Sequence, residues 1–164
     1  MQLVSTGSSL QYPISIANAQ VTDEQRQQLE RNDLLFGADF ARIVSVMMRH
    51  EPHRSLRLAD LETRVMPPLF TGQFALLNVL PDGALLPVPV AVALWATISP
   101  DADQRVSSNI NDFNLTPTEW RSGDIIWLVD MIGDIQSREA LRKELNITVF
   151  KDRNVKSRLA VGST

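Results

Sequence analysis

Asp130 lies inside the most apolar stretch of the chain, Ile125–Ile132. An ionised carboxylate that is buried without a partner is costly, so proteins pair such a group, shift its pKa or use it chemically. The residues before it continue the pattern as Trp-x-Ser-Gly-Asp-x-x-Trp-x-x-Asp, from Trp120 to Asp130. Asp130 is therefore a candidate catalytic group, and the structural alternative is a buried salt bridge or a cap on a neighbouring loop.

His53 is the second candidate, because the chain contains only two imidazoles, His50 and His53. Imidazole is the natural general base near neutral pH. Pro52 is expected to end the preceding helix, which places His53 just past a core-facing segment. The alternative is a surface histidine at a helix end. Two histidines three residues apart, with no third ligand nearby, do not predict a metal site.

Several other chemistries lack their sequence signatures. No Gly-x-Ser-x-Gly elbow surrounds Ser122, no glycine-rich phosphate loop is present, and cysteine is absent. These absences argue against a standard serine hydrolase, a nucleotide-binding loop and a thiolate site. The tryptophans Trp95, Trp120 and Trp127 are expected in the core or in a pocket wall.

The composition indicates a globular chain. The sequence has 164 residues, 44% of them hydrophobic, and a net charge of -3. An acidic balance argues against general nucleic-acid binding, and no apolar run reaches the length of about 18 residues that suggests a membrane span. The N-terminus lacks the pattern of a secretory signal, which predicts a cytoplasmic protein. We expect a flexible arm over residues 1–20 and a single domain over 21–164.

Periodicity and turn signals predict helices followed by a hairpin and then a strand–helix–strand unit, which is an α/β or α+β class. Asp130 is expected to share its strand face with Ile126, Leu128 and Ile132. The expected elements are helices over 22–31, 36–48 (capped by Asp33), 55–66 (ended by Pro67-Pro68) and 137–145, a helical turn over 116–119, strands over 73–80, 85–98, 125–132 and 147–150, a surface loop over 99–115 and a solvated basic tail over 151–158.

Three quoted segments together resemble a known family. They are His53-Arg54 after a hydrophobic helix, Pro89-Val90-Ala91 leading to Trp95-Ala96, and Glu119-Trp120-x-Ser122-Gly123-Asp124-x-x-Trp127-x-x-Asp130. In order and spacing they resemble the RTX-toxin-activating lysine acyltransferases, the group that includes the haemolysin activator. The likeness covers roughly residues 40–135, with short insertions around Leu80–Leu86.

The resemblance implies a fold like the GNAT acetyltransferases, with a central mixed or antiparallel sheet flanked by helices. It implies transfer of a fatty acyl group from acyl carrier protein to internal lysine ε-amines of an RTX protoxin. The catalytic pair then falls on His53 and Asp130. The donor is the acyl carrier thioester, with no permanently bound cofactor and no metal. The partners implied are the carrier protein, the protoxin and a second copy in a homodimer. The expected substrate-binding residues are Arg54, Trp95, Trp120, Ser122, Gly123 and Trp127.

An apolar groove for the acyl chain is expected from Leu94, Trp95, Trp127 and Leu128. Arg49, Arg54 and Arg57 are candidates to receive the acidic carrier protein, as are the tail cations Lys151, Arg153, Lys156 and Arg158. If the paired roles are correct, the side chains of His53 and Asp130 lie within hydrogen-bonding reach or one water of each other.

Two departures from the family keep other readings open. The family carries a serine where this chain has His50, and the arm before the resemblance is longer than in the best-known members. One alternative is a non-catalytic module that binds acyl carrier or toxin. Another is a GNAT-like acetyltransferase that uses acetyl-CoA, against which the absence of a pyrophosphate-binding glycine loop counts.

Overall fold

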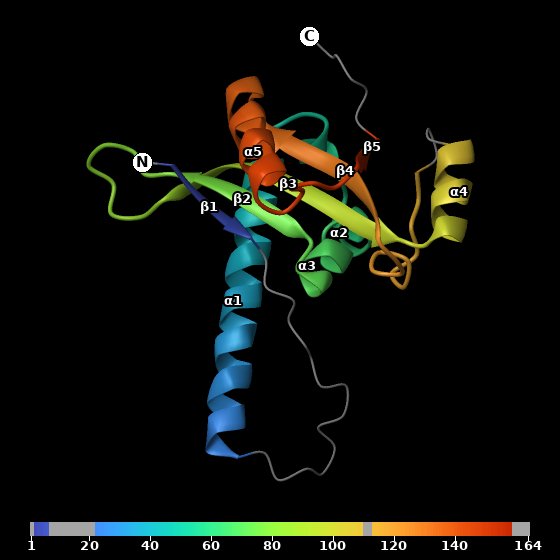
Figure 1. The fold of residues 1–164 in the computed structure, drawn as a ribbon. Coiled ribbons are helices and arrows are strands. Elements are labelled where there is room, and N and C mark those ends of the chain that lie inside the picture. The colour runs from blue at the N-terminus through green and yellow to red at the C-terminus, as the bar shows by residue number, and fades with distance from the viewer. Residues whose placement is uncertain (1, 7–21, 110–112, 159–164) are drawn as a thin grey trace.

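The structure, a computed structural model, describes residues 2–6, 22–109 and 113–158. Figure 1 shows the arrangement of its helices and strands. A single 3₁₀ turn, His53–Ser55, connects the first two helices. The elements in chain order are β1 (Gln2–Thr6), α1 (Asp23–Met47), α2 (Leu58–Arg64), α3 (Met66–Thr71), β2 (Phe74–Val79), β3 (Val88–Ile98), α4 (Pro100–Ser108), β4 (Ile125–Gly133), α5 (Ile135–Ile147) and β5 (Val155–Ser157).

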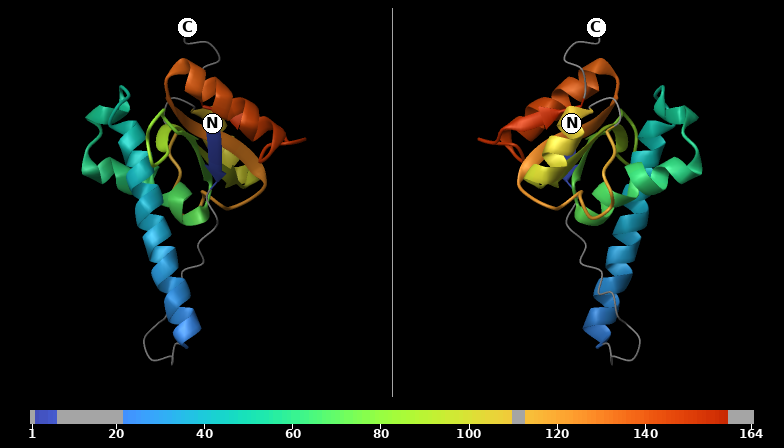
Figure 2. Two further views of the ribbon diagram at one scale, coloured as in Figure 1. Left: turned by 90° about the vertical axis from the view of Figure 1, so that its left-hand side faces the viewer. Right: turned by 90° about the vertical axis from the view of Figure 1, so that its right-hand side faces the viewer.

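The five strands form one sheet in the order β1-β2-β3-β4-β5. The first four strands pair antiparallel, and β5 pairs parallel to β4 after the crossover through α5. Figure 2 shows the sheet between α1 on one side and α5 on the other. The predicted class, a single α/β domain with a central mixed sheet flanked by helices, is confirmed.

Alternating residues of the strands feed separate apolar clusters on the two faces of the sheet. Leu94 belongs to the cluster under α1 and α3, whereas its neighbour Trp95 belongs to the cluster under α5. A third cluster continues the α1 face towards α4 and contains Ile98, Trp120 and Trp127. The site described below lies where the cluster under α1 and α3 meets the cluster that continues towards α4.

Helix α1 is one continuous helix of 25 residues, where the sequence predicted two. Thr22 caps it through a reciprocal capping box with Gln25. Asp33 lies in the helix interior and is not an N-cap, because no glycine or proline interrupts residues 23–36. Only its C-terminal part is buried on the sheet, and Figure 1 shows the N-terminal part extending beyond the sheet.

Two further predictions about helices are wrong. Pro67 and Pro68 do not end a helix, because they occupy the first turn of α3, where a proline loses no hydrogen bond. The segment 99–115, predicted as loop, contains α4. Ser99 caps that helix by accepting a hydrogen bond from the N–H of Ala102, and Pro100 opens it.

The expected strand at 147–150 is also wrong. Helix α5 continues to Ile147, and the N–H groups of Thr148 and Phe150 close onto the carbonyls of Glu144 and Leu145. These bonds use the backbone groups that a strand would need. The fourth predicted strand is replaced by β5, which lies in the basic tail. Residues 117–120 form a hydrogen-bonded turn where the sequence predicted a helical turn over 116–119.

Strand β1 falls inside the segment predicted to be a flexible arm. It pairs with β2 from Gln2 opposite Val79 to Thr6 opposite Ala75, and the rest of that predicted arm lies outside the described residues. Within the described ranges, no helix combines the length and the apolar character needed to cross a bilayer.

Candidate active site

His53 opens the 3₁₀ turn that follows α1, so its backbone is tied to the end of a buried helix. The N–H of Arg54 donates to the carbonyl of His50 at 3.0 Å, which closes this turn on the preceding segment. Arg49 donates to the carbonyl of Pro89 at the start of β3. These contacts hold the histidine against the sheet.

Asp130 owes its orientation to a β-bulge in β4. Leu94 lies opposite Asp130 and Trp95 lies opposite Leu128, so Val129 is an extra residue with no partner in the register. Because cross-strand partners share a face, Asp130 takes the α1 face with Leu94.

The bulge corrects the expected face of Asp130. Ile126 and Leu128 belong to the cluster under α5, whereas Ile132 belongs to the cluster under α1. Simple alternation along β4 therefore fails after Leu128, and Asp130 shares its face with Ile132 and with Trp127. The carboxylate consequently points to the side where α1 ends.

The structure brings the two candidate residues into contact. His53 Nε2 lies 2.8 Å from Asp130 Oδ2, and the two side chains are only 14% and 22% exposed. The second carboxylate oxygen accepts a hydrogen bond from the N–H of Met131 at 2.8 Å. The expected contact is thus present. Asp130 contacts the imidazole through Nε2. The other ring nitrogen, Nδ1, is buried without a hydrogen-bond partner among the described residues.

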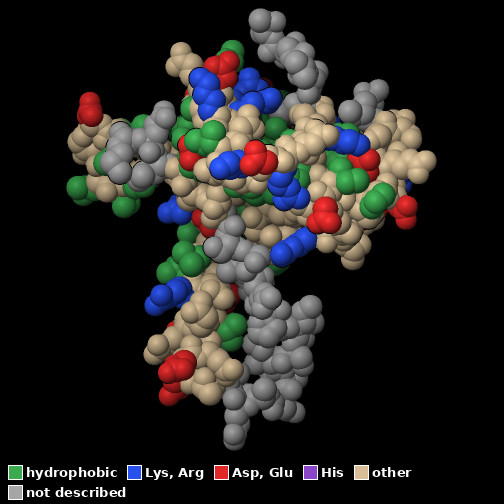
Figure 3. All heavy atoms as spheres, in the orientation of Figure 1, with side chains coloured by type: hydrophobic (Ala, Val, Ile, Leu, Met, Phe, Trp, Pro, Cys, Tyr) green, Lys and Arg blue, Asp and Glu red, His purple; other side chains and the backbone are tan. Residues whose placement is uncertain are grey.

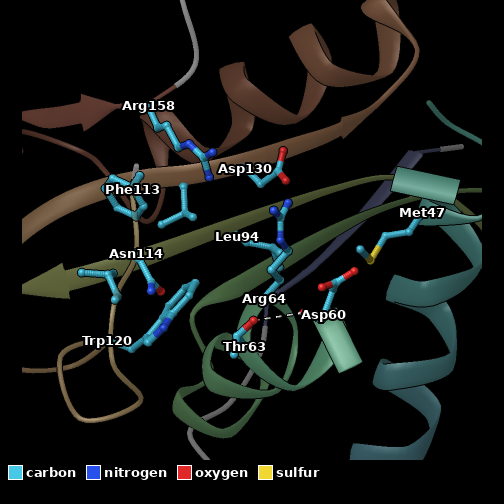
Figure 4. Close-up of a pocket in the computed structure, with 12 residues that line it drawn as sticks. Met47, Asp60, Thr63, Arg64, Leu94, Phe113, Asn114, Trp120, Asp130 and Arg158 are labelled. Atoms are coloured by element: carbon cyan, nitrogen blue, oxygen red, sulfur yellow. Dashed lines mark hydrogen bonds between the residues drawn. The ribbon is translucent and has the colours of Figure 1, made fainter. Parts of the chain in front are cut away.

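A cavity of about 300 Å³ opens beside this pair. Figure 4 shows that its walls come from α1, α2, β3, β4 and the segment before β4. Asp130 lines the cavity, and His53 reaches it only through its contact with Asp130. The lining residues are Met47, Asp60, Thr63, Arg64, Leu94, Phe113, Asn114, Leu115, Trp120, Val129, Asp130 and Arg158. The cavity therefore combines apolar walls with two carboxylates and two guanidinium groups.

The Trp-x-Ser-Gly segment forms a loop fixed against the end of β3. The N–H of Thr97 donates to the carbonyl of Trp120 at 3.0 Å, and the N–H of Gly123 donates back to the carbonyl of Thr97 at 3.1 Å. Ser122 Oγ accepts from the N–H of Ser99 at 2.9 Å. Ser122 and Gly123, expected to bind substrate, are thus placed as supports for Trp120 and not in the cavity wall.

Gly123 is required by close packing. A Cβ atom at this position would lie 2.5 Å from the carbonyl oxygen of Ile98, which is backbone and cannot turn away. This contact explains the glycine in the motif in terms of the loop's approach to β3.

Glu119 anchors the start of the same loop. Both of its carboxylate oxygens accept from Arg105, at 2.8 and 2.7 Å, and one also accepts from the N–H of Thr116 at 2.8 Å. The backbone hydrogen bond from Thr116 is the main cause that lowers the pKa of Glu119, and Arg105 lowers it further. The anchor is therefore ionised and charge-paired at neutral pH.

The other expected groove residues lie elsewhere. Trp95 packs edge-to-face on Phe150, with ring centroids 5.5 Å apart, on the α5 side together with Leu128. Trp127 Nε1 donates to Asp103 Oδ1 at 2.7 Å, outside the cavity wall. Of the four predicted groove residues, the cavity contains Leu94. Strand alternation explains the absence of Trp95 and Leu128, which face α5, whereas Trp127 shares the face of Leu94 but packs towards α4.

Asp103 binds two elements together. Lys156 Nζ lies 2.7 Å from both oxygens of Asp103 and also stacks over the ring of Trp127. Burial alone raises the pKa of Asp103, but the hydrogen bonds from Lys156 and Trp127 outweigh it and lower the pKa overall. The contact fastens β5 to α4.

Arg54 does not reach the cavity. Its side chain is 62% exposed and pairs with Glu51 at 3.2 Å. Sequence reasoning did not single out Asp60 or Arg64, and it named Arg158 only among the tail cations, yet all three line the cavity. Arg158 stood in a tail interpreted as solvated, and only the pairing of β5 with β4 brings it back to the sheet. No group of three metal-binding side chains occurs within the ranges that the structure describes.

Comparison with known proteins finds relatives of one type. The leukotoxin-activating lysine-acyltransferase of Mannheimia haemolytica serotype A1 is 27% identical over 103 residues, covering 63% of this chain and 57% of the relative. The same type of enzyme from a Pasteurella haemolytica-like species is 29% identical over 104 residues, covering 63% of this chain and 58% of the relative.

The RTX-II toxin-activating lysine-acyltransferase of Actinobacillus pleuropneumoniae is 27% identical over 93 residues, covering 57% of this chain and 53% of the relative. The chain thus matches a little over half the length of these relatives. The model of the RTX toxin acyltransferase family matches residues 32–163, a range that includes the His53–Asp130 pair and the whole cavity. The chain belongs to the RTX toxin acyltransferase family.

Proposed function

We propose that this protein transfers a fatty acyl group from acyl carrier protein to the ε-amine of an internal lysine in an RTX protoxin. His53 acts as general base and Asp130 orients it. The observation that carries the proposal is the 2.8 Å contact between His53 Nε2 and Asp130 Oδ2 beside a cavity, in a chain of this family.

The chemistry follows from the needs of an amine nucleophile. A lysine ammonium has a pKa of about 10.4 and must lose a proton before it attacks a thioester. With Asp130 accepting from Nε2–H, Nδ1 of His53 takes this proton, and the carboxylate stabilises the imidazolium. The neutral amine then forms the new C–N bond and releases its second proton to solvent, the C–S bond breaks, and the imidazolium of His53 gives its proton to the leaving thiolate.

Substrate binding has to uncover the base. Nδ1 of His53 is buried, whereas Asp130 lines the cavity, so the lysine approaches the pair from the cavity side and displaces neighbouring side chains. Asp60 supports this entry. The backbone hydrogen bond from Arg57 lowers the pKa of Asp60, so its carboxylate is ionised and attracts the incoming ammonium.

The partners belong to the same proposal. Arg57, whose side chain is 83% exposed, and Arg54 offer charge to an acidic carrier protein close to His53. Leu85 and Leu86, 96% and 75% exposed on the β2–β3 connection, are the apolar surface on which we place a homodimer contact. We place the reaction in the cytoplasm with its carrier-protein donor.

The test is acylation of an RTX protoxin fragment by purified protein and acyl carrier thioester, read as the intact mass of the fragment. We expect His53→Ala to lower the rate roughly 10²–10⁴-fold, the range of general-base catalysis. Asp130→Asn is expected to lower it by a similar factor, because the amide no longer fixes the imidazole tautomer. His50→Ala is the matched control, since this second histidine does not line the cavity.

If the wild-type protein leaves the mass of the protoxin fragment unchanged, the proposal is wrong. If the wild type binds the carrier protein without adding mass to the fragment, the non-catalytic binding module is the correct reading. Activity in His53→Ala equal to that in His50→Ala would remove the assigned mechanism. Circular dichroism of each variant shows that the comparison is made between folded proteins.

A further inference from the structure

Trp120 lines the cavity and carries a buried hydrogen-bond donor that has no acceptor among the described residues. The residue is 3% exposed, and its Nε1 has no partner among the described residues. Figure 4 shows the indole at the cavity wall, away from Asp130. Folded proteins satisfy nearly all buried donors, and an orphaned one at a cavity points to a ligand acceptor.

The loop holds this donor in a fixed position. The carbonyl of Trp120 accepts from Thr97, Gly123 closes against β3, and Glu119 is clamped by Arg105. Trp127 offers a direct contrast, since its Nε1 already donates to Asp103 at 2.7 Å. A rigid, unpaired donor costs little to reorganise when an acceptor arrives.

The position of Trp120 along the sheet defines which acceptor it meets. The carbonyl of Trp120 accepts a hydrogen bond from the N–H of Thr97. Thr97 lies three residues along β3 from Leu94, which is opposite Asp130. At about 3.3 Å per strand residue, this separates the Trp120 backbone from the pair by roughly 10 Å along the strand. Figure 4 likewise shows the indole apart from Asp130, so a carbonyl that reacts beside His53 is not the acceptor that the indole meets.

The same cavity carries two guanidinium groups that the acid–base step does not use. Arg64 and Arg158 extend into it from α2 and from the residue after β5, as Figure 4 shows. Guanidinium groups match phosphate oxygens. A donor that carries a phosphate therefore finds two cationic partners in this cavity.

We propose that Trp120 Nε1 donates a hydrogen bond to an amide carbonyl of the donor's pantetheine arm and so positions the thioester beside His53. This rests on the thioester donor of the proposed function. The pantetheine arm carries amide carbonyls farther from the sulfur than the reacting carbonyl, as the separation of Trp120 from Asp130 requires. Trp120 is a positioning residue for the donor.

The first experiment compares two donors bearing the same acyl group. Acyl-phosphopantetheine contains the amides, and the ethanethiol thioester contains none. Trp120→Phe keeps the ring and removes the N–H, so we expect a roughly threefold to tenfold rise in KM for acyl-phosphopantetheine, the worth of one hydrogen bond. With the ethanethiol thioester, wild type and variant should give the same rates. An equal loss with both donors would overturn the inference.

The second experiment needs no turnover. In ¹⁵N-labelled protein, the indole N–H signal of Trp120 is identified by its loss in Trp120→Phe, and a non-reactive S-alkyl phosphopantetheine is added. We expect the Trp120 signal to shift and its exchange with water to slow, while the Trp127 signal stays in place. No response of Trp120 at saturation, or no binding, overturns the inference. If the Trp120 signal shifts but the protein acylates no fragment, the contact between Trp120 and the pantetheine arm is supported and only the proposed function is wrong.

Discussion

One extra residue in β4, Val129, shows how much a site can depend on a local irregularity. The bulge gives the cavity both Val129 and Asp130 from consecutive positions, which a regular strand would send to opposite faces. The sequence marked Asp130 as a costly buried carboxylate, and its contact with His53 resolves that cost. No residue type in Leu128-Val129-Asp130 signals a bulge, so the sequence predicted the wrong strand face for Asp130.

Gly123 is the residue whose substitution tests the loop most directly. In Gly123→Ala the new methyl group meets the carbonyl of Ile98 at 2.5 Å, so the loop or β3 must shift. We expect a loss of about 1–3 kcal/mol in the free energy of unfolding, as for other overpacked sites. Thermal unfolding followed by circular dichroism measures it.

Gly37→Ala is the matched control for Gly123→Ala. A Cβ at Gly37 meets nothing within 4 Å, and the residue lies in the interior of α1. The alanine is expected to raise stability by up to about 1 kcal/mol through helix propensity. A Gly123→Ala protein that unfolds at the wild-type temperature would show that the close approach to Ile98 is not rigid.

At the scale of elements, the attachment of β5 brings Arg158 to the cavity. Strand β5 has only three residues, Val155–Ser157, and Lys156 ties it to Asp103 on α4. Short edge strands gain little from their own ladder, so the side-chain contact carries a large share of the local order. The tail is thus part of the site.

Lys156→Gln tests this attachment. We expect the amides of residues 155–157 to exchange with solvent several-fold faster, which corresponds to up to about 1 kcal/mol, since Lys156 is 40% exposed and its pairing is weakened by solvent. Hydrogen exchange measured by NMR gives the result residue by residue. Lys143→Gln on exposed α5 is the control, and equal exchange in both variants would contradict the assigned role.

At the scale of the whole molecule, four described carboxyl groups have a pKa below its ordinary value. Hydrogen bonds from Thr116, Ser137 and Arg57 are the leading causes for Glu119, Asp134 and Asp60, and Asp103 is lowered as described above. A lowered pKa in the folded state means that the folded form binds protons less readily than the unfolded chain. Stability is therefore full above the ordinary values of 3.8 and 4.5 and is lost as pH falls through the lowered values.

The prediction is a stability that changes little from about pH 7 to pH 5 and falls steeply below about pH 4.5. Asp39, whose pKa is raised by burial, opposes this trend weakly. In the double variant Asp103→Asn, Glu119→Gln the slope below pH 4.5 should be smaller, because two titrating groups are gone. Urea unfolding at a series of pH values measures the slopes, and identical slopes would contradict the assignment.

The parts of the molecule that the sequence predicted are those governed by local patterns. Alternating and continuous apolar residues located β2, β3 and β4, and the buried charge of Asp130 together with the only two imidazoles pointed to the pair. The cavity wall was not predictable in the same way. Arg64, Phe113 and Arg158 meet only after the helices and β5 pack, and no local pattern encodes that meeting.

The pairing of β1 with β2 has a consequence for the order in which the chain is built. Strand β1 is synthesised before its partner β2, which leaves the ribosome only after α1, α2 and α3. Long-range strand pairing is slow because the loop must close before any contact rewards it. Until then β2 presents an open sheet edge, and such edges recruit foreign strands. Strand β1 therefore finds its place late although it precedes its partner, and the growing polypeptide is most exposed to mispairing during that interval.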